Sequence, residues 1–536
     1  MLCEIPVELQ IRILLHLDIV DLVGCTTLCK HIGAIIKDSA ILQYKLELCA
    51  TGMVDTGGLP GLSVSERLSR LRAYEGSWYF TPLTSRPHPA SKKLNQCSNL
   101  WKASDDTIAY TSEGMFKLLR LPSVSRGVPE MTWSLDPPRI KAKNIASISV
   151  DHAQDLMVVS RWVRRRTHGH IRVRLKGRFL SVQQKGAPHP LAALPVHVWD
   201  VVPNIQDADC HTSIHGDLIG CTIGKGHKHM QVFNWKTGIL VWRHRSTVRA
   251  FFQILDSSKV LLVEDYTMYI HTFDPSATTS VPGGNVARSH CELQLPPVVD
   301  TNPLLSKCEA QSMSASFAHC NSVFAPDPSL AVIAVEYRID WSMWGPYTSV
   351  ALLMLLPIRT LLSQADRASE QRKIAPTQKV SIPWDDWGPD GTRCLLLENE
   401  TRGISVVGSK CALHFRESYR TTLDDEVVDV VVIIDARPWV HMAPYYDHPN
   451  HYPGSELFFL GPASPRAQRL LASPLRSTLP YKILCRVINL RPELDARQMI
   501  LQENGLAVAH MIESYAYLDN VPEDERAEES LELLLT

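Results

Sequence analysis

Apolar positions at the start of the chain recur at helical spacing. Leu9, Ile13 and Leu17 are four residues apart, the interval that places side chains on one face of an α-helix. Asp18 and Asp21 follow as candidate N-cap residues, whose side chains can accept hydrogen bonds from the first amides of a second helix. The pattern therefore predicts a module of short helices at the start of the chain.

A linker with one further helix follows this module. Ser63 and Glu66 have the spacing of a capping box, in which each side chain bonds the backbone amide of the other residue. Apolar residues come after them at helical intervals, at Leu68, Leu71 and Tyr74. We therefore assign residues 1–48 to the helical module and residues 49–77 to a linker whose helix bridges it to the rest of the chain.

From about Trp78 the chain changes to short apolar runs separated by Gly, Pro, Asn and Asp, which is typical of β-strands joined by turns. Similar strand starts recur at Leu156, Leu218 and Val260, and similar strand ends at Trp199, Trp235 and Phe273. The aromatic residues of the strand ends are 36 residues (235 − 199) and 38 residues (273 − 235) apart. We expect residues 78–518 to form a β-propeller-like body, with about seven or eight blades of the usual ~40 residues.

The predicted fold class is therefore mainly β with an N-terminal helical module. An acidic tail closes the chain, because the residues from Glu523 onward include six acidic side chains and one arginine. We expect this tail, residues 519–536, to be solvated or mobile.

The composition indicates an intracellular protein without a general attraction to polyanions. The 536 residues include 55 basic and 56 acidic ones, so neither nucleic acid nor an anionic membrane is an expected partner. The longest apolar run, Ser349 to Ile358, is shorter than the roughly 20 residues that cross a bilayer, and we interpret it as a buried strand. No signal peptide is recognisable, and none of the 13 cysteines forms a Cys-x-x-Cys pair. We expect reduced thiols and a cytoplasmic or nuclear location.

The helical module also carries a more specific motif. Its residues are Ile5-Pro6-Val7-Glu8-Leu9, Ile13-Leu14, Leu17, Asp21-Leu22 and Leu28-Cys29-Lys30. This series resembles the F-box, in which Leu-Pro-x-Glu-Leu is followed by paired apolar residues, Asp-Leu and Val-Cys-Lys. Ile5 and Leu28 depart mildly from that pattern, and the Trp that usually follows the Cys-Lys pair is missing.

The resemblance implies a docking function for the module. An F-box binds a Skp-type adaptor and, through it, the cullin scaffold of a ubiquitin ligase. A unit this short buries only part of its apolar surface by itself, so it has apolar side chains to offer to a partner. Six residues would divide between the core of the module and the face that meets the adaptor: Pro6, Leu9, Ile13, Leu14, Leu17 and Leu22. In the alternative interpretation, this stripe only caps the β body as a helical bundle.

Two further segments extend the resemblance. Gln43 to Leu48 with Gly52-Met53, and Asn234 to Gly238, resemble parts of fungal F-box proteins that have a propeller-like C-terminal region. The implied function is that of a substrate-recognition subunit in an SCF-type (Skp-cullin-F-box) ubiquitin ligase, with the β body holding an unknown protein target. The chain would supply proximity rather than catalytic groups. The alternatives are an interaction scaffold that assembles no ligase and a propeller-based hydrolase.

A second candidate site is the basic segment from Arg161 to Lys185, which contains no acidic residue. Its cations alternate with apolar residues, so a strand would present four of them on one face: Arg172, Arg174, Lys176 and Arg178. Such a row could pair with the phosphate groups of a phosphorylated target, or with an RNA backbone, although no stacking aromatic residues are interleaved in it. It could also be a solvated hairpin face or a nuclear import address.

Other chemistry is not indicated. Six histidines lack the Cys or carboxylate partners of a recognisable metal site: His168, His170, His211, His215, His227 and His229. No phosphate-binding loop, dinucleotide fingerprint or nucleophile elbow occurs, so we expect no cofactor and no catalytic residues. Five aromatic residues are interpreted as propeller packing, with a recognition surface as the alternative: Trp341, Trp344, Tyr347, Trp384 and Trp387.

Overall fold

The computed structural model describes most of the helical start of the chain and much of the β-rich remainder. The described residues are 5–80, 99–102, 104, 107–112, 115–135, 145–167, 170–199, 209–224, 228–277, 289–298, 303–310, 322–340, 349–374, 380–397, 401–420, 425–437, 482–488, 495–502, 505–511 and 529–535. Within these ranges, no helix combines the length and the hydropathy that a membrane crossing requires.

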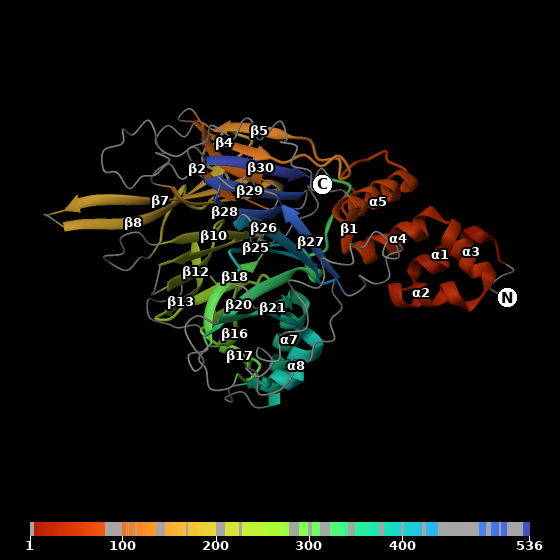
Figure 1. Cartoon of the computed structure of the whole chain (residues 1–536). Helices are drawn as coiled ribbons and strands as arrows, with labels where there is room; N and C mark the ends of the chain where they lie inside the picture. The colour runs from red at the N-terminus through yellow and green to blue at the C-terminus, as the bar shows by residue number, and fades with distance from the viewer. Residues whose placement is uncertain are drawn as a thin grey trace.

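Short helices form the N-terminal module, as the spacing of its apolar residues predicts. They are α1 (Val7–His16), α2 (Ile19–Leu28), α3 (Lys30–Asp38) and α4 (Ala40–Thr51), followed by the longer α5 (Val64–Phe80). Asp18 is the N-cap of α2, because its carboxylate accepts a hydrogen bond of 2.8 Å from the backbone amide of Asp21. The capping box of α5 is also formed, with the Ser63 amide donating to Glu66 at 2.8 Å. These helices stand on one side of the β body (Figure 1).

The β body is a six-blade propeller, and each blade is an antiparallel sheet in which successive strands pair. The first blade consists of β2 (Asn99–Lys102), β3 (Thr107–Ser112), β4 (Met115–Arg120) and β5 (Met131–Leu135). The second blade consists of β6 (Ile145–Asp151), β7 (Leu156–Thr167), β8 (His170–Ser181) and β9 (Val196–Trp199). The third blade consists of β10 (Cys210–His215), β11 (Leu218–Ile223), β12 (Lys228–Asn234) and β13 (Ile239–Ser246).

The other three blades follow the same plan with one addition. The fourth blade consists of β14 (Ala250–Ile254), β15 (Lys259–Glu264), β16 (Thr267–Thr272) and β17 (Ser289–Leu293). The fifth blade consists of β18 (Leu304–Ala310), β20 (Val332–Asp340), β21 (Ser349–Pro357) and β23 (Arg393–Leu397). The sixth blade consists of β24 (Gly403–Val407), β25 (Lys410–Arg420), β26 (Asp425–Asp435) and β27 (Lys482–Ile488). The fourth blade gains a parallel edge strand, β22 (Val380–Ile382), which pairs with β17.

The described residues form six blades of four or five strands, whereas we expected seven or eight blades in the whole body. That expectation divides the length of the body by a standard blade, but several blades of this chain are longer. The second blade has two central strands of 12 residues each. The fifth blade holds two inserted helices, α7 (Ile358–Ile374) and α8 (Trp384–Gly391), between β21 and β23. A count based on length assigns such insertions to additional blades.

A three-stranded sheet follows the sixth blade. Its last strand lies in the segment that we expected to be a solvated or mobile acidic tail, so that expectation is wrong for residues 529–535. The sheet consists of β28 (Asp495–Gln502), β29 (Gly505–Met511) and β30 (Glu529–Leu535), and β30 pairs along β29. In Figure 1 it lies between the first and the sixth blade. The expectation relied on the number of acidic residues and overlooked a strand pattern, in which leucines at 531, 533 and 535 alternate with polar residues at 530 and 532. The remainder of the predicted tail lies outside the described residues.

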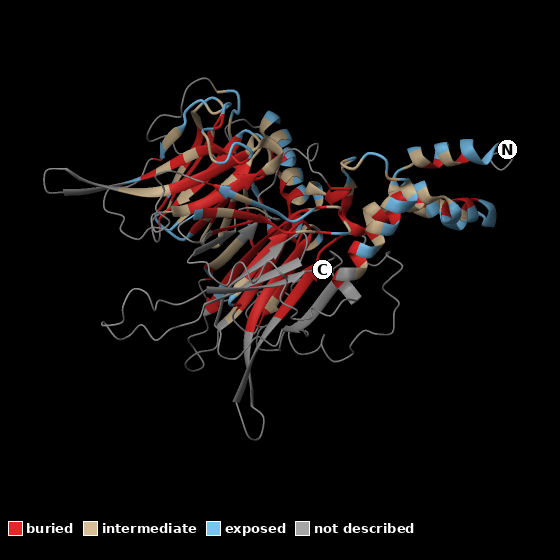
Figure 2. Cartoon of the chain, turned by 90° about the horizontal axis from the view of Figure 1, so that it is seen from above, coloured by how far each residue is buried: buried red, intermediate tan, exposed pale blue. Residues whose placement is uncertain are grey.

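The hydrophobic core lies between neighbouring blades, where one sheet face packs on the next. Leu175 and Phe179 of β8 are fully buried against Phe233 of β12, and the two phenylalanine rings are 5.5 Å apart. Comparable clusters join the first and second blades, the third and fourth, the fourth and fifth, and the fifth and sixth. Figure 2 shows these buried residues as continuous layers inside the β body.

The repeat read from the sequence is right for the strand starts and wrong for one strand end. Leu156, Leu218 and Val260 all begin the second strand of a blade or follow its first residue. Trp235 and Phe273 both follow a third strand, and their amides donate to carbonyls just before the second strand, at 3.1 and 2.9 Å. Val182 makes the equivalent bond in the second blade, whereas Trp199 ends a fourth strand. The interval of 36 residues between Trp199 and Trp235 therefore resembles the interval between Trp235 and Phe273 only by coincidence, because Trp199 occupies a different position in its blade.

Part of the predicted aromatic packing is confirmed. Trp384 and Trp387 of α8 are buried in the core shared by the fourth and fifth blades, with ring centroids 5.3 Å apart. The apolar run read as a buried strand forms β21, which pairs on both sides with β20 and β23. The other three aromatic residues, Trp341, Trp344 and Tyr347, lie outside the described residues.

The packing between the third and fourth blades yields a test of the fold. A Cβ on Gly220 of β11 would lie 2.8 Å from both Phe252 Cζ and Ser213 Oγ, so Gly220→Val should lower the free energy of unfolding by about 1–3 kcal/mol. Gly403→Val is the matched control, because a Cβ there meets only His414 Cβ at 3.8 Å. Urea unfolding measures both variants. Equal stability of the two variants would contradict this packing.

Candidate functional site

The outward side of α1 carries an apolar stripe. Leu9 and Ile13 are 47% and 44% exposed, and Pro6 is exposed one turn before Leu9. The Pro6 carbonyl accepts the amides of Leu9 and Gln10 at 3.0 and 3.1 Å, so the proline starts the helix without needing a donor of its own. Residues three or four positions apart share one side of a helix. We call Pro6, Leu9 and Ile13 the α1 stripe.

Leu14 and Leu22 lie in the core of the module instead of on its surface. They are 2% and 0% exposed and pack in one cluster with Ile32, Ile35, Ile36 and Leu42. Leu17 is half-buried against the same cluster. The structure therefore divides the six candidate residues: Leu14 and Leu22 support the module from within, because their side chains pack against residues of α3 and α4, and only the α1 stripe is open to a partner.

The end of α1 is held by a lysine from α4. Lys45 Nζ donates hydrogen bonds of 2.7 and 2.5 Å to the carbonyls of Leu15 and Leu17. The last carbonyls of a helix have no partner within it, and a cation there also complements the negative end of the helix dipole. Lys45 thus positions the α1 stripe. Lys45 lies in the segment from Gln43 to Leu48 that resembles fungal F-box proteins, but nothing in the sequence indicated that it holds the end of α1.

The helix α5 connects the module to the β body through an apolar contact. Leu71, Tyr74 and Trp78 of α5 are buried together with residues of the sixth blade. Tyr74 also meets Phe324 of β19 (Phe324–Pro326) edge to face, with ring centroids 5.4 Å apart. The short β1 (Met53–Asp55) pairs with β19 just beyond the end of α4. The chain therefore leaves the module and enters the body through one continuous packed region.

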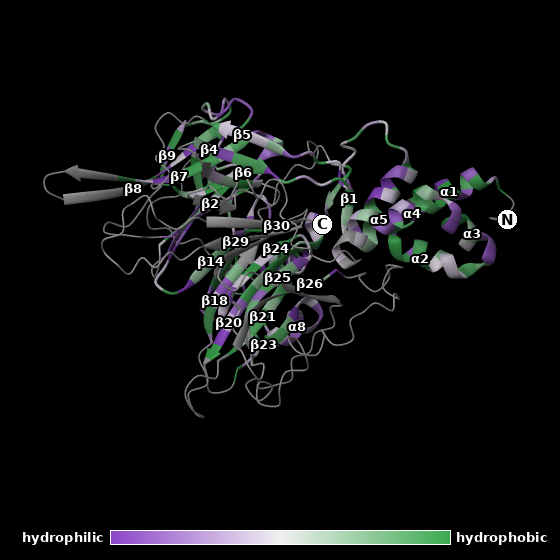
Figure 3. Cartoon of the chain, turned by 45° about the horizontal axis from the view of Figure 1, so that its top comes forward, coloured by the Kyte–Doolittle hydropathy of each residue, from purple (hydrophilic) through white to green (hydrophobic). Residues whose placement is uncertain are grey.

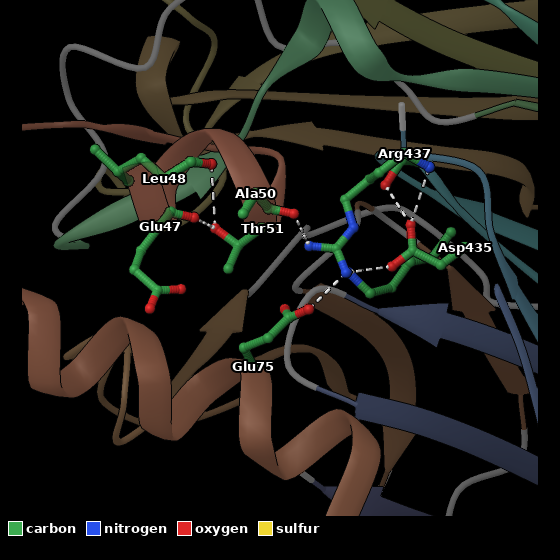
Figure 4. Close-up of polar contacts among 9 residues, drawn as sticks. Glu47, Leu48, Ala50, Thr51, Glu75, Asp435 and Arg437 are labelled. Carbon is green, nitrogen blue, oxygen red and sulfur yellow. Dashed lines mark hydrogen bonds and ion pairs between the residues drawn. The ribbon is translucent and has the colours of Figure 1, made fainter. Parts of the chain in front are cut away.

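A buried arginine completes this junction (Figure 4). Arg437, just after β26, is 0% exposed, and its Nη2 lies 2.5 Å from Glu75 Oε1 of α5 and 2.7 Å from Asp435 Oδ2. Its Nη1 donates to the carbonyl of Ala50 near the end of α4 at 2.7 Å. One planar guanidinium thus ties two helices to the body, a task that suits the fixed fork of arginine.

Gly52 gives the arginine side chain room to reach the helices. It is the C-cap of α4 in a left-handed conformation with φ of +66°, which glycine adopts at little cost. A Cβ at this position would lie 2.9 Å from Arg437 Cδ. A second ion pair lies on the helical side, where Arg72 Nε is 3.0 Å from Glu47 Oε1. Burial raises the pKa of Glu47, although the Arg72 guanidinium opposes that shift.

The basic candidates lie on β8, which pairs with β7 along its whole length. Arg174 is exposed and Lys176 and Arg178 are half-buried, while the intervening Leu175 is buried in the core, so the predicted alternation is present here. The side chain of Arg172 lies outside the described residues. The β7–β8 pair, which we call the basic ribbon, projects from the body in Figure 1 on the side away from the N-terminal helices, whose position beside the body Figure 3 also shows.

The histidines do not form a metal site in the part of the chain that the structure describes. No group of three or more His, Cys, Asp or Glu residues is placed there as metal ligands would be. Among the six histidines of interest, burial lowers the pKa of His215, since desolvation disfavours the imidazolium. His168 and His227 lie outside the described residues.

The comparison with protein families assigns the helical module. Residues 2–44 match the F-box domain, so the chain carries an F-box at its N-terminus. This match covers α1 to α3 and the first part of α4, the same residues that hold the α1 stripe and its buried core.

Three solved structures align with the chain at low identity. The WD40 domain of SCAP from fission yeast aligns at 8% identity with a TM-score of 0.31, covering 76% of this chain and 79% of that one. Hsv2p of Kluyveromyces lactis aligns at 13% identity with a TM-score of 0.22, covering 48% and 67%. PorZ, a surface component of the type-IX secretion system of Porphyromonas gingivalis, aligns at 9% identity with a TM-score of 0.24, covering 63% and 44%. A search of curated proteins found no match.

Replacing Arg437 by methionine should loosen the junction. The change leaves Glu75 and Asp435 buried without their shared cation, and breaking a buried ion pair in this way costs about 3–5 kcal/mol. Hydrogen exchange of the α5 amides measures the effect, which should be a strong acceleration.

The control for this variant is Arg67→Met on the same helix. Arg67 pairs with Asp55 at 2.7 Å, and because the arginine side chain is 14% exposed and the carboxylate 36% exposed, breaking this pair should cost less than breaking the fully buried contacts of Arg437. If Arg437→Met left α5 as protected as Arg67→Met does, the junction would not depend on the buried guanidinium.

Proposed function

We propose that this chain is the substrate-recognition subunit of an SCF-type ubiquitin ligase. The observation that carries the proposal is the F-box match over residues 2–44, which coincides with a folded helical module that displays the α1 stripe. In this function the F-box binds a Skp-type adaptor, the adaptor brings the cullin, and the β body binds a protein target.

The α1 stripe has the properties of an adaptor contact. Leu9 and Ile13 are large apolar side chains kept nearly half exposed, and their burial by a partner would remove apolar surface from water. The core behind them is complete, because Leu14 and Leu22 are already buried within the module. The module therefore needs no rearrangement to present this surface, which favours binding because little conformational entropy is lost.

The junction supports a function that depends on proximity. A receptor promotes ubiquitin transfer by raising the effective concentration of its target near the charged conjugating enzyme, and a firm connection between adaptor site and target site preserves that effect. The buried contacts of Arg437 with α4 and α5 supply such a connection. The chain itself would contribute no catalytic group to the transfer.

The β body is the proposed target-binding part, with the basic ribbon as its candidate contact. Arg174, Lys176 and Arg178 would supply the cations, together with Arg172 from the undescribed side chains of the strand. The reaction would take place in the cytoplasm or nucleus. An interaction scaffold that binds the adaptor without assembling a ligase is the remaining alternative, and recruitment of the cullin distinguishes the two.

Introducing charge into the α1 stripe should abolish adaptor binding. Each of Leu9→Asp and Ile13→Asp places a carboxylate where the contact requires an apolar group, and truncating a central contact residue costs about 2 kcal/mol or more. We expect the double variant to bind a purified Skp-type adaptor at least about 100-fold more weakly in isothermal calorimetry.

The matched control is Val124→Asp in the first blade, since Val124 is 91% exposed and lies outside the F-box. It should bind the adaptor as the unchanged chain does, and both variants should keep the unfolding transition of the β body. Adaptor binding that survives the double substitution would show that another surface makes the contact.

A pull-down of the cullin tests the ligase more directly. The unchanged chain with the adaptor should retain the cullin, and the Leu9→Asp, Ile13→Asp variant should retain neither partner. Retention of the adaptor without the cullin would favour the scaffold over the ligase subunit.

A further inference from the structure

Two cysteines of the third blade lie on one face of neighbouring strands. Cys210 begins β10, and Cys221 of β11 lies opposite Thr212, which is two residues further along β10. Side chains two residues apart on a strand project to the same face, so Cys210 and Cys221 are diagonal neighbours. Both pack in the core between the second and third blades, where Cys221 is fully buried and Cys210 is partly buried. The strand register therefore brings two thiols into one cluster.

The two thiols are in contact, and both are free. The Cys221 thiol shares a hydrogen bond with Cys210, and neither residue is part of a disulfide. Burial, together with this hydrogen bond, raises the pKa of the Cys221 thiol, so this group stays protonated at neutral pH. Cys210 is partly open to solvent. A small reactive solute therefore reaches Cys210 before it reaches Cys221.

Hydrogen bonds on both sides of Cys210 hold β10 in this register. The amide of Thr212 donates to Ser147 Oγ of β6 at 3.0 Å, which ties β10 to the second blade. On the other side, the amide of Gly224 donates to the carbonyl of Asp209 at 3.0 Å, just beyond the paired residues of β10 and β11. Cys210 lies between these two fixed points. Its contact with the second thiol therefore persists, and such proximity raises the effective concentration of one reacting group near the other.

We propose that Cys210 and Cys221 form a reversible disulfide bond when the protein reacts with hydrogen peroxide. In the first step the Cys210 sulfur attacks one peroxide oxygen and the O–O bond breaks, which leaves a sulfenic acid on Cys210 and releases water. In the second step the Cys221 sulfur attacks the Cys210 sulfur and the S–O bond breaks, so that the hydroxyl leaves as water with the proton of the Cys221 thiol. Two thiols thus give two electrons and two protons to one peroxide, which yields two water molecules.

The diagonal placement favours a labile bond over a structural one. Diagonal neighbours in a sheet have Cα atoms about 7–8 Å apart, whereas a disulfide usually joins Cα atoms about 4.4–6.8 Å apart. Closing the bond therefore strains the strand pair between its fixed points, and strained disulfides are reduced more readily. A bond of this kind suits a redox sensor in a compartment that keeps thiols reduced. The inference goes beyond the proposed ligase function and does not depend on it.

Mass spectrometry of the oxidised chain tests the proposal. The reduced intact chain is treated with hydrogen peroxide, its remaining thiols are blocked with iodoacetamide in denaturant, and it is digested with pepsin at low pH, where few thiolates remain to exchange disulfides. We expect a linked peptide pair that contains Cys210 and Cys221, with loss of iodoacetamide labelling at both residues. Dithiothreitol should restore both labels.

An exposed thiol of the F-box controls for the reagent. Cys29 is exposed, so its oxidation shows that the peroxide has reacted with the protein. Oxidation of Cys29 without the linked pair of Cys210 and Cys221 would overturn the proposal. This measurement needs no substitution, so it stands even if a variant fails to fold.

Two variants test the order of the steps. In Cys221→Ala the sulfenic acid of Cys210 has no second thiol to react with, so its labelling by dimedone, which traps sulfenic acids, should exceed that of the unchanged chain. In Cys210→Ala the buried Cys221 should keep its iodoacetamide label after peroxide treatment. The matched control Cys29→Ala should form the linked pair as the unchanged chain does. Equal oxidation of Cys221 with and without Cys210, or a linked pair that depends on Cys29, would contradict the assignment.

Discussion

One buried guanidinium joins the two parts of this protein. Arg437 belongs to the β body, whereas Ala50 and Glu75 belong to helices, and all three meet where solvent has no access to the arginine. A buried cation is stable only while its partners surround it, so the helices cannot separate from the body without leaving charges unpaired. The α1 stripe and the basic ribbon are therefore presented by a single connected molecule, each at its own end.

Local chemistry was predicted well from the sequence because it depends on residues a few positions apart. The N-cap Asp18 is one example. The capping box of Ser63 and Glu66 is another, since the Ser63 amide donates a hydrogen bond of 2.8 Å to the Glu66 carboxylate. The junction could not be predicted in this way, because Arg437 and Glu75 are 362 positions apart. Blade counting failed for a related reason, since a period assumes equal repeats and the insertions in this chain differ in length.

The candidate site shows a second limit of periodicity. Leu9, Ile13 and Leu17 define an apolar helical face, and such a face is normally buried. In this module the side with Gln10 and Leu14 faces the core, while Leu9 and Ile13 remain exposed. An apolar pattern therefore locates a helix but does not tell a core from a surface reserved for a partner. Conflict between local pattern and burial is expected at functional surfaces, where stability is not the only requirement.

The central claim is that the F-box is the surface by which this chain joins a ligase. Hydrogen exchange of the intact chain, with and without a purified Skp-type adaptor, tests it most directly. The account predicts slower exchange of the amides in α1 and its neighbouring helices when the adaptor is present, and no change in the blades. Protection confined to the β body, or no protection anywhere, would contradict it.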